Sequence, residues 1–364
     1  MADSGITNEA LSRQESGIDR VANQARRHTE LLTQAAEEKN GLGGVLETWS
    51  SDFEAKHPAT NEQILTAIAE IMAPQNRHGT PRWQLVEADK RTLDEPQTAH
   101  VMSLAQDFGM LLPKEAETPQ DLLAGPEIFA VVEGGANRTA VVRRNLVLEL
   151  LADRARSIGQ LNMLPVFQLG SHREILRVRQ DGSPNAEYQV AQEICGQYFP
   201  RDEKLILKDS ITEQELNIHS ALSEGWVKGF DFAHSLDGFD QATQLVRSDN
   251  EPKIFALLSA NTNDGGLPGL PLTLERLLAV RAQTENIGER QLVVATNGQY
   301  RPKDEIQAAI ACLKSGVDPA NIRAIGDETG QRGPNVYTRE IGVLARLILE
   351  FNTELVNAGR PNIV

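Results

Sequence analysis

The stretch EIFAVVEGGANRTAVVRR, residues 127–144, decides the fold that the sequence predicts. Its short apolar run, predicted as a strand at 127–133, is followed by Gly134 and Gly135, and a helical pattern starts near Arg138. Continuous apolar runs of this length are typical of strands that are buried on both faces of a parallel sheet. The stretch therefore predicts a buried strand, a glycine-rich turn and a helix that covers the sheet.

The same alternation continues to the end of the chain. Further short runs are predicted as strands, at 163–169, 204–208, 254–259, 291–296 and 322–326. Helical patterns lie between and after them, at 138–157, 185–198, 212–225, 273–285, 303–315 and 337–357. This order predicts an α/β fold, a three-layer Rossmann-like and mostly parallel sheet. The predicted domain spans 120–364, with an insertion around 226–290.

Residues 1–115 are predicted as a helical N-terminal region. Residues 7–38 are very polar and carry only a thin apolar stripe, formed by Leu11, Ile18, Val21, Ala25 and Leu32. Such a segment is a solvated or partner-seeking helix, or it is partly disordered. It is therefore the candidate for binding a protein partner or a second copy of the chain. Further along, Thr60 and Gln63 match a capping box and predict a helix start.

Composition limits the partners. The formal net charge of −15 argues against nucleic acid and against an anionic membrane, since both need an excess of lysine and arginine. No apolar run approaches the roughly 20 residues of a membrane span. The first residues have no basic and apolar leader pattern, so we expect no secretory signal. The two cysteines, Cys195 and Cys312, imply no disulfide framework and favour a cytoplasmic setting.

Three of the predicted strands are followed by a small polar loop and an arginine. The residues are Gly134, Gly135, Asn137 and Arg138 after the first strand, Gly170, Ser171 and Arg173 after the second, and Thr296, Asn297 and Arg301 after the fifth. Helix N-termini carry partial positive charge, so arginine there is unfavourable unless an anion is bound. The pattern predicts a site for a phosphate or carboxylate group, and a small anionic metabolite as its ligand.

Two carboxylates are expected near the same edge. Glu187 lies near a predicted helix start, and Asp209 directly follows the third strand. Each is a candidate hydroxyl binder or general base, although a surface role is the simpler interpretation of Glu187. Neither a G-x-G-x-x-G motif nor a P-loop occurs, and the seven histidines lack zinc-site spacings. The sequence therefore predicts no metal site and identifies no cofactor.

The order of these motifs resembles the YdcF/SanA-like family. The shared features are a strand with Gly-Gly and Arg138, a strand with Gly-Ser and a helical Glu187, a strand with Asp-Ser-x-Thr-x-x-Glu from Asp209, and a late strand with Thr296 and Arg301. The resemblance covers roughly residues 125–330 and implies a Rossmann-like three-layer fold. The function of the family is poorly defined. Some members are associated with nucleotide-like ligands such as S-adenosylmethionine, and others with envelope processes.

Two functions are consistent with the sequence. The first is an enzyme that acts on a small anionic metabolite, with arginines as clamps and a carboxylate as base. The second is a non-catalytic ligand-binding or regulatory protein that recruits a partner through residues 7–38. A buried carboxylate beside the ligand site favours the first function. An exposed apolar stripe on the N-terminal helix favours the second.

Overall fold

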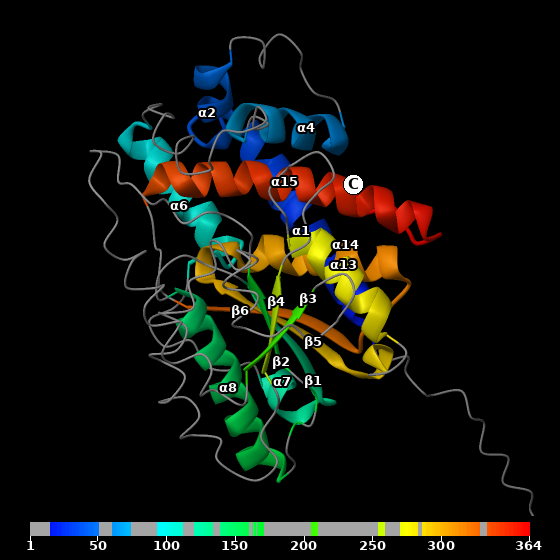
Figure 1. Cartoon of the computed structure of the whole chain (residues 1–364). Helices are drawn as coiled ribbons and strands as arrows, with labels where there is room; N and C mark the ends of the chain where they lie inside the picture. Colours follow the sequence, from blue (N-terminus) through cyan, green and yellow to red (C-terminus); the bar gives the residue numbers. More distant parts are fainter. Residues whose placement is uncertain are drawn as a thin grey trace, which may run out of the picture.

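The computed structural model describes residues 15–50, 60–73, 93–111, 120–133, 139–159, 162, 164, 166–170, 205–209, 254–258, 270–282, 286–327 and 333–364. The strands form one sheet of six parallel strands in the order β3-β4-β2-β1-β5-β6 (Figure 1). Their bounds are β1 Ile128–Val132, β2 Val166–Gly170, β3 Leu205–Asp209, β4 Ile254–Leu258, β5 Gln291–Asn297 and β6 Asn321–Asp327. The predicted α/β fold with a parallel sheet is confirmed.

Helices cover both faces of this sheet. In Figure 1, helix α8, Thr139–Ile158, lies on one face, and α13, Leu270–Arg281, and α14, Arg301–Ser315, lie on the other. The strands are apolar throughout because both faces are covered: all five residues of β1 are buried. Each predicted strand is present, and the predicted helices at 185–198 and 212–225 lie outside the described residues.

The strand order places β1 at a point where the chain changes direction. Strand β1 pairs with β2 on one side and with β5 on the other. The chain thus goes from β1 to β2 on one side of the sheet, and later returns to β5 on the opposite side. Ligands of open α/β sheets bind at such a switch point, beyond the carboxyl ends of the strands. The edge at β1 and β5 is therefore the expected ligand-binding edge of this sheet.

Most of the described helices before β1 form a further layer. They are α1 Gly17–Glu37, α2 Leu42–Trp49, α4 Asn61–Met72 and α6 Glu95–Asp107, whereas the short α7, Gln120–Ala124, packs on α8. Helix α1 packs on α14, while α4 and α6 pack on the long C-terminal helix α15, Pro334–Asn357 (Figure 1). The capping box of Thr60 and Gln63 is present, as predicted. These helices share one hydrophobic core with α14 and α15, and a separate N-terminal domain stays a prediction.

The apolar stripe of helix α1 is buried against other parts of the same chain. Ile18, Val21, Ala25 and Leu32 are at most 1% exposed, and Leu11 lies outside the described residues. The helix also packs on the edge strand β6, where Arg20 Nη2 donates to Ile322 O, and Gly17 N–H donates to Pro319 O at 2.8 Å just before that strand. Edge strands need such cover to avoid pairing with other chains. A partner that bound α1 in this conformation would meet its polar face.

Among the described helices, none combines the length and the apolar character that a bilayer crossing requires.

Glycine at position 342 allows α15 and α4 to pack closely. A Cβ atom added there would lie 2.8 Å from Ala73 N and 2.9 Å from Met72 Cβ. Replacing glycine by alanine inside a helix usually stabilises it by roughly 1 kcal/mol. Here we expect Gly342→Ala to lower the free energy of unfolding instead, by about 1–3 kcal/mol, because the contact is overpacked.

Urea unfolding checks this expectation. Gly288→Ala is the matched control, since its nearest neighbour would be Asp318 O at 3.8 Å, an ordinary contact distance. The control should stay within about 0.5 kcal/mol of the wild type. A Gly342→Ala variant more stable than the wild type would contradict the close packing of α15 on α4.

Candidate functional site

A pair of carboxyl groups, one fully buried and one partly exposed, lies at the switch point. Glu133 follows β1 directly, and its N–H donates to Ala295 O of β5 at 2.9 Å, which places it beside Thr296. Asp304 lies in the first turn of α14, the helix that follows β5. The Thr296 hydroxyl oxygen is 2.7 Å from Glu133 Oε2 and 2.6 Å from Asp304 Oδ2. One hydroxyl therefore joins two carboxyl groups from different strand ends.

This arrangement requires an extra proton. A hydroxyl has a single hydrogen to donate, and an ionised carboxylate can only accept. Thr296 cannot donate to Glu133 and to Asp304 at once, so one of the two carboxyl groups must be protonated and donate to Thr296. Both oxygen–oxygen distances are in the range of strong O–H···O hydrogen bonds. The three side chains form a chain along which one proton is shared.

Burial indicates that Asp304 carries the proton. Its side chain is fully buried, and removal from water, followed by the negative charge of Glu133, raises its pKa to about 7. The nearby Lys303 and Arg143 and the Thr296 hydrogen bond oppose this rise. Asp304 Oδ1 has no hydrogen-bond partner among the described residues. Glu133 is 25% exposed at its side chain, so it is the member of the pair that faces solvent.

Arg143 of α8 supports Glu133 from the other side. Its Nη1 donates to the Glu133 carbonyl oxygen at 3.1 Å and lies 3.4 Å from the Glu133 carboxylate. The arginine side chain is only 4% exposed. It therefore holds both the backbone and the carboxylate of Glu133 at the end of β1.

A second buried ion pair fixes the first turn of α14. Lys303 Nζ lies 3.2 Å from Glu340 Oε2 of α15, and the two side chains are 6% and 2% exposed. The same ammonium lies 3.7 Å from the centroid of the Tyr300 ring, a cation–π distance. This pair ties α14 to α15 beside Asp304, so it positions the carboxyl pair without touching it.

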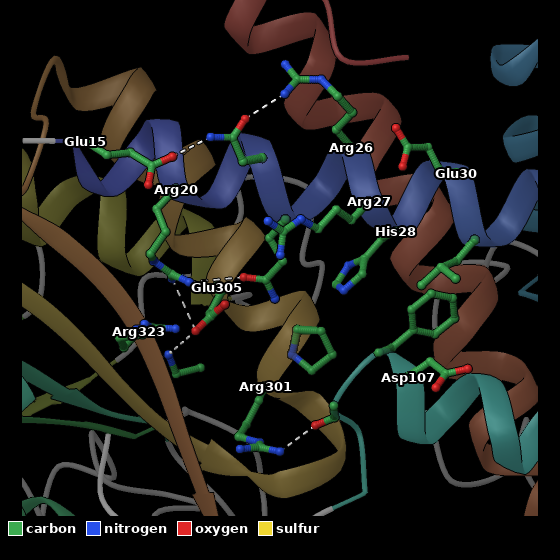
Figure 2. A pocket seen from close by; sticks show the side chains of 17 residues that line it. Glu15, Arg20, Arg26, Arg27, His28, Glu30, Asp107, Arg301, Glu305 and Arg323 are labelled. Carbon is green, nitrogen blue, oxygen red and sulfur yellow. Dashed lines mark hydrogen bonds and ion pairs between the residues drawn. The ribbon is translucent and has the colours of Figure 1, made fainter. Parts of the chain in front are cut away.

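A cavity of about 1020 Å³ lies between α1 and the start of α14. Figure 2 shows Arg20 and His28 reaching from α1 toward the side that carries Arg301, Glu305 and Arg323. Arg20 pairs with Glu305 at 3.3 Å, and Arg301 Nη2 donates to Gly109 O at 2.6 Å. The first turn of α14 thus contributes to two sites: Asp304 contacts Thr296, and Arg301 lines the cavity.

The structure brings several of the predicted site residues to one edge. Gly170 ends β2 and Asp209 ends β3, and both are aligned with Leu258 of β4, while Asn297 ends β5. The Asp209 side chain, and the whole of Gly134, Gly135, Asn137, Arg138, Ser171, Arg173 and Glu187, lie outside the described residues. Convergence of Arg138 and Arg173 with the edge therefore stays a prediction.

Thr296 and Arg301 have definite roles in the structure. Thr296 is fully buried, and its hydroxyl is engaged by Glu133 and Asp304, so it reaches a ligand only through Glu133. Arg301 is the first residue of α14, two residues before the predicted helix start, and Tyr300 is the N-cap residue. Its guanidinium points to Gly109, at the end of α6, and lines the cavity.

Sequence reasoning missed Glu133, Asp304 and Arg143. Glu133 stands directly between a buried strand and the Gly134-Gly135 pair, a position that could have marked it. Asp304 gave no signal, because an acidic residue in a first helical turn is ordinary. No group of three or more His, Cys, Asp or Glu side chains in the described part of the chain is arranged to hold a metal ion.

Comparison of the chain with protein-family models, with curated proteins and with solved structures gave no match.

Proposed function

We propose that this protein is an enzyme that binds a small anionic metabolite at the carboxyl ends of β1 and β5 and exchanges a proton with it. The observation that carries the proposal is the Asp304–Thr296–Glu133 chain of two short hydrogen bonds at the switch point of the sheet. Glu133 is the group that meets the substrate, and Asp304 supplies or stores the proton behind it.

The protonation of Asp304 suits this role. General acids and bases work best when their pKa lies near the operating pH, and that of Asp304 is raised to about 7. Perturbed carboxyl groups in a sheet-edge site are also more frequent in active sites than elsewhere. The structural alternative is that the pair only locks β5 to α14. A purely structural contact does not require Glu133 to reach solvent, so this alternative does not account for the partial exposure of its side chain.

The charge of the substrate is proposed from the residues that connect the sheet to its helices. The segment 134–138, with two glycines and Arg138, joins Glu133 to α8, and Ser171 and Arg173 follow Gly170. Glycine-rich turns and arginines before helices favour phosphate or carboxylate groups. The resemblance to YdcF/SanA-like proteins supports a nucleotide-like compound as one member of this class.

A ligand screen with turnover measurement tests the proposal. Nucleotides and sugar phosphates are screened by thermal shift, and each binder is then followed by mass spectrometry for conversion. We expect at least one compound to raise Tm and to be converted. Glu133→Gln should lower the conversion rate by roughly 10²- to 10⁴-fold, because it removes the group that exchanges the proton.

Glu289→Gln is the matched control. Glu289 is an exposed carboxylate in the turn Ile287–Glu289, which precedes β5 at the opposite edge of the sheet. It should convert the ligand as the wild type does. Equal conversion by Glu133→Gln and Glu289→Gln would show that Glu133 takes no part in the reaction.

A further inference from the structure

The cavity between α1 and α14 is a second candidate site. Its walls come from α1, the end of α6, the start of α14 and β6. Its volume of about 1020 Å³ is at the upper end of the range for sites that hold small organic ligands. It lies on the side of α14 that carries Arg301 and Glu305, whereas Asp304 of the same turn faces Thr296.

Arginine is the most frequent residue type in the walls of this cavity. Five arginines line it, and Arg20 is paired with Glu305 and Arg323 with Asp121. Arg27 and Arg301 have no carboxylate within ion-pair distance among the described residues. The other lining carboxylates, Glu15, Glu30 and Asp107, are exposed, as Arg27 is, so water screens these charges.

Arg301 is a partly buried cation in the wall of the cavity whose hydrogen bonds go to uncharged groups. Its guanidinium is half-buried, and its two hydrogen bonds go to the backbone oxygens of Gly109 and Gly298, at 2.6 and 3.4 Å. Neither acceptor carries a charge. Loss of hydration lowers the pKa of Arg301, although Glu305 opposes this change. A charge held partly out of water without a counter-ion is unfavourable, and an anion in the cavity would relieve it.

His28 adds an independent sign of a ligand. Its side chain lines the cavity and is 5% exposed, and its Nδ1 has no hydrogen-bond partner in the described part of the chain. Burial lowers its pKa to about 4, so the ring is neutral near pH 7. Its contact with Phe108 is edge-on, at 5.0 Å between ring centroids. A buried polar nitrogen without a partner requires an explanation, and a ligand atom supplies one.

We propose that this cavity binds a diphosphate or triphosphate group, held by Arg27 and Arg301 with His28 beside it. Guanidinium groups bind phosphate oxygens through paired, charge-assisted hydrogen bonds. A chain of two or three phosphates matches cations that come from two separate elements, α1 and α14. Bound there, it would connect α1 to the first turn of α14, which also carries Asp304.

Calorimetric titration of the full chain tests the proposal with two probes, inorganic tripolyphosphate and ATP. Both should bind the wild type. Equal affinities would show that the phosphates alone are recognised, and a higher affinity for ATP would show that its nucleoside also contacts the cavity. Arg27→Gln and Arg301→Gln should each weaken binding by roughly 10- to 100-fold.

Three outcomes keep the proposal separate from folding and from the switch-point site. Arg27 is exposed, so Arg27→Gln should fold normally even if Arg301→Gln is unstable. Arg156→Gln, which removes an arginine that is 66% exposed on α8, should bind as the wild type does. Arg27 lies on α1 and lines this cavity, so weaker binding in Arg27→Gln assigns the phosphates to the cavity and not to the switch-point edge. Absence of binding to both probes, or equal affinity in Arg27→Gln and Arg156→Gln, would overturn the proposal.

Discussion

Asp304→Asn is expected to remove a large pH dependence of stability. The pKa of Asp304 rises from 3.8 to about 7 on folding, chiefly because the side chain loses its water. Its contribution is fully present below about pH 4 and is lost as pH rises through 7, because only the unfolded chain ionises it freely. The full loss is on the order of 4 kcal/mol. The wild type should therefore lose stability between about pH 4 and 7, with little further loss from this group above pH 7, and the variant should lose less.

Urea unfolding at pH 5, 6, 7 and 8 measures this dependence. The amide introduced by Asp304→Asn is neutral at each of these pH values and can still donate to Thr296. The free energy of unfolding of the variant should therefore rise relative to that of the wild type as pH rises. Asp107→Asn is the control, because Asp107 is an exposed carboxylate at the end of α6. It should keep the wild-type slope. An unchanged slope in Asp304→Asn would mean that Asp304 is ionised in the folded protein.

Lys303→Met is expected to destabilise the fold by about 3–5 kcal/mol, because it leaves a buried carboxylate without its lysine. Glu340 is 2% exposed at its side chain and cannot turn to water. The double variant Lys303→Met/Glu340→Met should be more stable than Lys303→Met alone, since it also removes the buried charge. The measurement is the free energy of unfolding in urea at pH 7.

Lys314→Met gives the matched control on the same helix. Lys314 pairs with Glu350 of α15 at 3.5 Å, but these side chains are 34% and 45% exposed. Exposed pairs contribute about 0–1 kcal/mol, so this variant should differ little from the wild type. Equal losses in Lys303→Met and Lys314→Met would show that the buried pair does not fix α14 to α15.

The sheet and its helices were largely predictable because local sequence determines them. A fully buried strand such as β1 needs a continuous apolar run, and that run is visible in the sequence at 128–132. The bounds of β5 and α15 agree with the predicted ones to within a few residues. By contrast, the polar helix α1 was predicted as solvated, partner-seeking or partly disordered. Its apolar stripe is buried because α14 and β6, far along the chain, supply the surface on which it packs.

The candidate site was predictable only in part. The switch-point edge follows from the strand order, and Asn297 and Thr296 lie near it as expected. The carboxyl pair could not be predicted, because Glu133 and Thr296 are 163 residues apart in sequence and meet only through the pairing of β1 with β5. Arg301 is the first residue of α14, two residues before the predicted start of that helix. Its direction depends on Gly109, a backbone oxygen that no sequence motif marks.

The central claim is that the edge of β1 and β5 binds a ligand through a carboxyl pair that shares one proton. Carbon-13 NMR of aspartate-labelled protein, titrated with and without the ligand found in the screen, tests it most directly. We expect one carboxyl signal, absent in Asp304→Asn, to titrate near pH 7 and to shift when the ligand binds at Glu133. If every aspartate signal titrates below about pH 5, or if the Asp304 signal is unmoved at saturating ligand, the claim is contradicted.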